Sequence, residues 1–113
     1  NMDDCLFCKI INEEIPGDKV YEDDNVYAFR DISPAAPVHI LIIPKEHISS
    51  MADVGAEQYA AHLFKAVRLI AAQEGLSENG FRVVANTGAD GGQTVGHMHL
   101  HLPGGRSLQW PTG

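Results

Sequence analysis

Apolar residues along this chain recur with two periods, one typical of helices and the other of strands. A period near 3.6 residues predicts a short helix over Cys5–Asn12, with Asp3 or Asp4 as its cap, and a longer helix over Asp53–Glu74 whose first residue can cap it. Gly75 suits the left-handed position that commonly follows the last turn of a helix. The core-facing stripe of the longer helix is expected to consist of Tyr59, Leu63, Val67 and Ile70.

Short apolar runs elsewhere in the chain are typical of strands. Val20–Glu22 and Val26–Arg30 flank an acidic turn, and the run His39–Ile43 predicts a central strand. Phe81–Ala85 and Met98–Leu102 bring the expected number of strands to about five. The order of elements predicts an α+β fold, with an antiparallel sheet covered on one face by helices. Because such a sheet leaves open edges and an uncovered face, we expect a homodimer in which it continues into a larger sheet.

Composition narrows the class of protein. A chain of 113 residues with 44% hydrophobic and 20% charged residues is expected to form a single domain, residues 1–113, with Asn1 as a cloning remnant ahead of Met2. Eight basic against fifteen acidic residues give a net charge of -7, which argues against binding a nucleic-acid polymer. No apolar run is long enough to cross a membrane and the acidic start lacks a signal-peptide pattern, so a cytoplasmic protein is expected.

The segment that carries most chemical information is His97-Met98-His99-Leu100-His101-Leu102. Side chains alternate between the two faces of a strand, so His97, His99 and His101 are expected on one face. A neutral imidazole is a nucleophile near pH 7, and a neighbouring imidazole can supply or accept a proton. The array therefore favours a reaction centre, with an exposed polar face or a set of metal ligands as alternatives.

A glycine-rich loop, Asn86–Thr94, precedes the histidines. Glycines allow backbone N–H groups to converge on a phosphate, and Gln93 and Thr94 could add side-chain donors. Such a composition alone is equally typical of a mobile turn. Next to three histidines it predicts a site for phosphoryl chemistry.

The chain also contains one CxxC motif, Cys5-Leu6-Phe7-Cys8, without a second cysteine pair. A structural disulfide is not expected in a cytoplasmic protein, and no thioredoxin-like pattern accompanies the motif. Two thiolates together with two imidazoles would suit zinc. The alternative is a pair of reduced, half-buried thiols on a helix.

Taken together, these motifs resemble those of the histidine triad (HIT) family, most closely its nucleoside-phosphoramidase, or histidine triad nucleotide-binding, branch. Two positions depart from the family pattern. Pro103 stands where a second apolar residue usually follows the triad, and Gly96 stands where the branch often has a larger residue. The resemblance covers nearly the whole chain and is carried by Cys5–Ile15, Phe29–Pro34, His39–His47, Val84–His101, Gly104-Gly105-Arg106 and Trp110–Gly113.

The resemblance implies a hydrolase or transferase of purine nucleotides that cleaves the P–N bond of nucleoside 5′-phosphoramidates through a covalent nucleotidyl-histidine. His99 would attack the α-phosphorus, His101 would hydrogen-bond the phosphate oxygens, and His39 would join a proton relay. No catalytic metal is implied. The implied catalytic residues are His99, His101, His97 and His39.

A nucleotide-binding set is implied as well. Asp31 would bind the ribose hydroxyls or merely cap its turn, and Phe29 and Ile32 would enclose the base or belong to the core. Asn86 would lie at the reacting end or simply end a strand, and Trp110 would reach the partner's site across a dimer. The full set is Ile10, Ile15, Phe29, Asp31, Ile32, Asn86, Gly92, Gln93, Thr94, His99 and His101.

Some HIT relatives carry a zinc site that joins a CxxC motif to two histidines. If His97 binds zinc, it cannot also move protons, and the metal would then be structural. The zinc ligands implied here are Cys5, Cys8, His47 and His97.

Two alternative functions stay open. One is a dinucleoside polyphosphate hydrolase of the same family, and the other is a nucleotide-binding or zinc-stabilised interaction protein. Arg106 and the tryptophan tail favour the phosphoramidase branch. The nucleophile expected at His99 argues against a protein that only binds.

Overall fold

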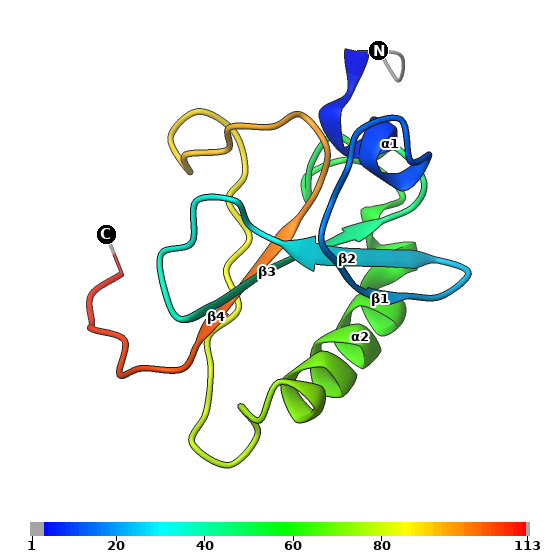
Figure 1. Ribbon diagram of the computed structural model, residues 1–113. Coiled ribbons are helices and arrows are strands. Elements are labelled where there is room, and N and C mark those ends of the chain that lie inside the picture. The colour runs from blue at the N-terminus through cyan, green and yellow to red at the C-terminus, as the bar shows by residue number, and fades with distance from the viewer. Residues whose placement is uncertain (1–3, 113) are drawn as a thin grey trace.

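The computed structural model describes residues 4–112 and shows one sheet with helices on both sides (Figure 1). The sheet is antiparallel and four-stranded, with the order β1-β2-β3-β4. The elements are α1 (Leu6–Ile11), β1 (Lys19–Glu22), β2 (Val26–Arg30), β3 (Val38–Pro44), the 3-10 helix η2 (Ala56–Tyr59), α2 (Ala60–Gln73) and β4 (Leu100–Gly104). The α+β class is therefore confirmed. Within residues 4–112, no helix has the length and apolar character needed to span a membrane.

The sheet separates two apolar clusters, because successive side chains of a strand point to opposite faces. Long α2 lies across one face and buries Leu63, Ala66 and Ile70 there. Short α1 buries Phe7 and Ile10 against the opposite face. The prediction that helices cover one face is therefore wrong. The strand residues under α2 are Val26, Ala28, Ile40, Ile42, Leu100 and Leu102, and those under α1 are Tyr27, Phe29, Leu41 and Ile43.

The start of α2 lies later in the chain than predicted. Asp53 does not cap α2, because its Oδ2 accepts the N–H groups of Ser49 at 2.9 Å and Ser50 at 3.3 Å and thereby closes a separate turn. Gly55, at φ 94°, leads from this turn into η2. The far end agrees with the prediction, since Gly75 follows the helix with φ 74°.

The cap of α1 is Cys5 rather than an aspartate. Its Sγ accepts the N–H of Cys8 at 3.3 Å, which satisfies a donor that the first helical turn leaves free. Asp4 precedes this cap, and Asp3 lies outside the described residues. The CxxC motif therefore forms the beginning of the helix.

The segment Phe81–Ala85 is not the regular fifth strand that was predicted. It runs along β4 through isolated bridges that pair Phe81 with Gly104 and Val84 with His101. The N–H of Arg82 donates to the carbonyl of Pro103 at 3.1 Å, but proline has no N–H to donate in return. The missing donor interrupts the ladder. β4 itself begins and ends two residues later than predicted, at Leu100 and Gly104.

Candidate functional site

The three histidines lie on the side of the sheet that α1 covers, as predicted, although only His101 lies within β4 and the other two precede it. The ring of Phe7 meets His97 and His99 edge-on, with ring centroids 5.9 and 5.1 Å apart. The rings of His99 and His101 are 5.0 Å apart. Met98, which lies between two of the histidines, packs into the cluster beneath α2. The three imidazole side chains thus lie together on one side of the sheet.

His99 is held with one nitrogen available. Its Nδ1 lies 2.8 Å from the carbonyl oxygen of His97. A carbonyl can only accept, so Nδ1 carries the proton and the lone pair of the neutral ring is on Nε2. The side chain is buried, and it lines a cavity. These features are those of an imidazole nucleophile with a fixed tautomer.

His101, His39 and Asp31 form a connected group beside His99. Nε2 of His39 lies 3.0 Å from Nδ1 of His101 and 3.5 Å from Oδ2 of Asp31. Burial, together with the neighbouring His99 and His39, lowers the pKa of His101 below its usual value, against the opposing effect of Asp31. His101 is therefore neutral near pH 7.

A cavity of about 260 Å³ opens beside these histidines. One part of its wall is polar, with Thr94, His99 and His101, and another is apolar, with side chains of α1 and β2. The predicted residues that line the cavity are Ile10, Ile15, Phe29, Asp31, Ile32, Thr94, His99 and His101.

Three residues of the predicted nucleotide-binding set do not line this cavity, namely Asn86, Gly92 and Gln93, and the predicted catalytic residues His39 and His97 lie outside its lining as well. The amide of Gln93 is already occupied, because Nε2 donates to the carbonyls of Ser49 at 2.7 Å and Val95 at 2.9 Å. Its Oε1 accepts the N–H of Gly88 at 3.0 Å. Gln93 therefore holds the glycine-rich loop in shape, and neither amide hydrogen is free for a phosphate. Trp110 is 82% exposed and also lies outside the cavity lining of its own chain.

Other residues of the cavity wall were not predicted. Leu41 could have been found, because it follows His39 by two positions in β3 and must share its face. Gly17 approaches α1 so closely that a Cβ atom there would lie 2.9 Å from Ile10 Cγ2. The unpredicted lining residues are Leu6, Phe7, Pro16, Gly17, Asp18, Arg30, Leu41 and Val95.

The predicted zinc ligands come together beside the three histidines. One potential ligand atom from each of Cys5, Cys8, His47 and His97 lies within 4.8 Å of the others. Nδ1 of His97 is 3.3 Å from Sγ of Cys5 and 3.6 Å from Sγ of Cys8, and Nδ1 of His47 is 3.3 Å from Sγ of Cys8. Bonds of about 2.3 Å to sulfur and about 2.0 Å to nitrogen would place tetrahedral ligands about 3.5 Å apart. The four residues therefore fit zinc.

The protonation of the group agrees with a metal site. Nε2 of His97 lies 2.9 Å from the carbonyl oxygen of Pro44, so it carries the proton and the Nδ1 lone pair faces the thiols. Burial lowers the pKa of His97 to about 4, which keeps the ring neutral. Burial and the adjacent Cys5 raise the pKa of Cys8 to about 11, so without a cation the thiol stays protonated.

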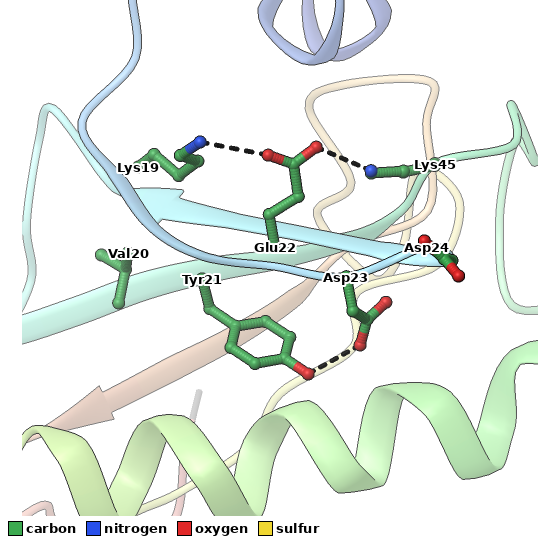
Figure 2. Close-up of a pocket in the computed structure, with 7 residues that line it drawn as sticks. All are labelled: Lys19, Val20, Tyr21, Glu22, Asp23, Asp24 and Lys45. Atoms are coloured by element: carbon green, nitrogen blue, oxygen red, sulfur yellow. Dashed lines mark hydrogen bonds and ion pairs between the residues drawn. The ribbon is translucent and has the colours of Figure 1, made fainter.

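A larger hollow of about 500 Å³ lies at the β1–β2 hairpin, away from the histidines. Figure 2 shows Glu22 between Lys19 and Lys45, with ion pairs of 3.1 and 2.6 Å, and the Tyr21 hydroxyl donating to Asp23 at 2.7 Å. Glu22 is thus paired with one lysine of the hairpin and with Lys45, which follows β3.

Comparisons with known proteins place this geometry in a family. A HIT domain model matches residues 12–108. The purine nucleoside phosphoramidase of Escherichia coli strain K12 is 52% identical over 108 residues, which cover 94% of this chain and 91% of that protein. This chain belongs to the HIT family.

Further relatives agree with this assignment. The 14 kDa zinc-binding protein of Brassica juncea is 50% identical over 114 residues, covering 97% of this HIT chain and 100% of that protein. The structure of a HIT family hydrolase from Legionella pneumophila superposes with a TM-score of 0.93 at 51% identity, over 97% of this chain and 100% of that one. The predicted HIT fold and hydrolase class are confirmed.

Proposed function

We propose that this HIT protein hydrolyses the P–N bond of purine nucleoside 5′-phosphoramidates and releases a nucleoside monophosphate. The observation that carries the proposal is the arrangement of His99. Its Nδ1 donates to the His97 carbonyl at 2.8 Å, so its Nε2 is unprotonated. The ring lines the cavity. The similarity to a protein named purine nucleoside phosphoramidase supports the substrate class.

The reaction has two steps. Nε2 of His99 bonds to the α-phosphorus as the P–N bond to the leaving amine breaks, and that amine takes a proton from solvent. Water then attacks the phosphorus, breaks its bond to His99 and returns a proton to solvent. His101 donates a hydrogen bond to the phosphoryl oxygens, where negative charge increases during both attacks. The Thr94 hydroxyl is a further donor at this part of the cavity.

The remainder of the cavity would hold the nucleoside. Ile10, Ile15 and Phe29 supply an apolar wall for the base, and Ile32, which is 99% exposed, can fold over it. Oδ1 of Asp31 accepts the N–H of Ser33 at 2.9 Å, which leaves carboxylate lone pairs for the ribose hydroxyls. A cavity that combines an apolar wall, hydrogen-bonding histidines and the Asp31 carboxylate favours a nucleotide over a plain phosphate.

We propose zinc as a structural metal held by Cys5, Cys8, His47 and His97. Bound zinc would supply cross-linking only, because four protein ligands leave no open position for a reacting water. The named zinc-binding relative from Brassica juncea supports this proposal. Buried thiols that hold a metal also suit a reducing compartment, so we propose the cytoplasm.

We further propose a homodimer. Phe64 of α2 is 74% exposed, and Phe81 and Val83 are each 40% exposed beside it. Together with Val67 and Ala71 they line an apolar groove of about 300 Å³. An apolar groove formed by a helix and an incomplete sheet edge suits a second copy of the chain. In such a dimer the exposed Trp110 would lie near the partner's cavity.

The deciding experiment uses an alkylamine phosphoramidate of AMP or GMP as substrate. We expect release of the monophosphate by the unmodified protein, and a loss of about 10⁴-fold or more in kcat for His99→Ala and His99→Gly. Mass spectrometry of rapidly quenched protein should show a nucleotidyl adduct on His99. Turnover that survives both substitutions would contradict the covalent mechanism.

The same assay separates the alternatives. Faster cleavage of a dinucleoside polyphosphate than of either phosphoramidate would favour the sister activity within the family. Tight mononucleotide binding without turnover of any of these substrates would favour a binding protein.

A further inference from the structure

The loop before β3 contacts His39 through a backbone amide. The N–H of Ala35 donates to Nδ1 of His39 at 3.0 Å. A backbone N–H cannot accept a hydrogen bond, so Nδ1 must carry the lone pair. The proton of the neutral ring then has one remaining position, Nε2. This contact therefore determines the tautomer of His39 without a charged group.

The tautomer of His39 determines that of the next histidine. Nε2 of His39 lies 3.0 Å from Nδ1 of His101, and the proton on the first nitrogen makes the second an acceptor. The neutral ring of His101 must then carry its own proton on Nε2. Since His101 lines the cavity, a fixed N–H donor becomes part of the cavity wall.

The carbonyl of Ala35, one peptide unit beyond this N–H, is itself held from the turn after β4. Nη2 of Arg106 donates to the carbonyl of Ala35 at 2.8 Å. Gly105 has φ 89°, and a Cβ atom there would lie 3.1 Å from Cβ of Pro37, so the turn and the loop are in close contact. Two prolines, Pro34 and Pro37, further restrict the loop backbone. The loop that carries this N–H is thus restrained by the Arg106 side chain and by close contact with the turn after β4.

We propose that Ala35 and Arg106 are positioning residues that fix the tautomers of His39 and His101, so that His101 presents Nε2–H to the phosphoryl group of the substrate. That this N–H meets a phosphoryl group depends on the proposed function, whereas the assignment of the two tautomers does not. His39 accordingly acts as a neutral hydrogen-bond donor. It does not carry a proton through the site, because a second ring proton on Nδ1 would point at the N–H of Ala35.

This assignment also explains a neighbouring group of potential metal ligands. Asp31, His39 and His101 offer ligand atoms within 4.8 Å of one another. A cation would need the lone pair of Nε2 on His39, but that nitrogen carries the proton. The carboxylate of Asp31, 3.5 Å away, instead lies near enough to support the same N–H electrostatically. These three side chains are therefore arranged for hydrogen bonding.

The test reads the tautomers directly. Long-range ¹H–¹⁵N spectra of the full-length protein at neutral pH should show both His39 and His101 protonated on Nε2. Replacing the Ala35 residue by lactic acid removes this N–H and leaves the side chain unchanged. We expect that ester variant to show mixed tautomers at both histidines, and kcat for the phosphoramidate to fall about tenfold with a smaller change in KM.

A matched pair of arginines provides the control. Nη2 of Arg106 and Nη2 of Arg82 each donate to a backbone carbonyl at 2.8 Å, those of Ala35 and Gln109 respectively. Arg106→Met should move the imidazole ¹⁵N signals of His39 and His101 toward mixed tautomers, and Arg82→Met should leave them unchanged.

Two results would overturn the proposal. One is a wild-type His39 protonated on Nδ1, and the other is a folded ester variant with unchanged tautomers. Because these spectra do not depend on turnover, absence of phosphoramidase activity would contradict the proposed function and leave the tautomer assignment standing.

Discussion

At the scale of single residues, the histidines differ in which ring nitrogen carries the proton, because their nitrogens have different hydrogen-bond partners. His97 donates from Nε2 to the Pro44 carbonyl at 2.9 Å, whereas His99 donates from Nδ1 to the His97 carbonyl at 2.8 Å. The free lone pair therefore lies on Nδ1 in the first ring and on Nε2 in the second. Both acceptors are backbone carbonyls whose positions depend on the fold. The spacing of the histidines predicts their common face and leaves these proton positions open.

We expect His101 to stay neutral to a pH below 6.5, the ordinary pKa of histidine, because burial and the neighbouring His99 and His39 oppose its charge. Its pKa is lowered in the folded state, so the unfolded chain binds more protons between the two values. The residue thus contributes stability above pH 6.5 that is lost as the pH falls through the folded-state value. An NMR titration of the imidazole signals checks this, and a midpoint at or above 6.5 would contradict it.

The stability effect has its own measurement. Urea unfolding of the unmodified protein and of His101→Gln, compared between neutral and mildly acidic pH, should show a smaller loss of unfolding free energy in the variant. An equal loss in both proteins would assign the acid sensitivity to other groups.

At the scale of elements, local rules predicted what depends on neighbours along the chain. Alternation predicted the common side of the three histidines, although only His101 lies in β4, and Gly75 correctly marked the left-handed residue just beyond the end of α2. The helical period of α1 shows that it has an apolar side, but not which face of the sheet that side meets. The role of Gln93 was missed because its partner Ser49 is 44 positions away. Asp53 was wrongly expected to cap α2, because its carboxylate instead accepts the N–H groups of Ser49 and Ser50, which precede it in the chain.

The short helix α1 contacts both the apolar wall of the cavity and the histidines. Phe7 is 3% exposed and its ring lies 5.4 Å from Phe29 and 5.1 Å from His99. We expect Phe7→Ala to lower the unfolding free energy by about 3–5 kcal/mol and to reduce kcat/KM, because the cavity left behind frees the His99 ring. Chemical denaturation and steady-state kinetics measure the two effects. Val54→Ala, at a fully exposed position, should change stability by less than about 0.5 kcal/mol.

Metal removal should act on the same helix. If zinc is held by the CxxC motif and two histidines, protein purified without added metal should contain it by elemental analysis, and Cys5→Ser/Cys8→Ser should not. Zinc at a hundredfold excess over its Kd stabilises a folded protein by about 2.7 kcal/mol, so chelation should lower the melting temperature by at least several degrees. Metal-free wild-type protein with unchanged melting after chelation would contradict the site.

At the scale of the whole molecule, the apolar groove between α2 and the incomplete sheet edge predicts the assembly state. Phe64→Glu places a charge in the groove and should shift the protein from dimer to monomer in sedimentation experiments. Val54→Glu, equally exposed but outside the groove, is the matched control and should stay dimeric. A wild-type protein that sediments as a monomer at high concentration would contradict the homodimer.

The division of the sheet into two faces has a practical consequence for protein engineering. In β2, β3 and β4, the buried apolar side chains at even positions pack beneath α2, and those at odd positions of β2 and β3 belong to the histidine face. At these buried positions, residue parity therefore tells an engineer which substitutions avoid the histidine face, whereas Arg30 is an exception because it lines the cavity. We expect libraries at the buried even positions to change mainly stability, and libraries at the odd positions of the histidine face to change mainly substrate range.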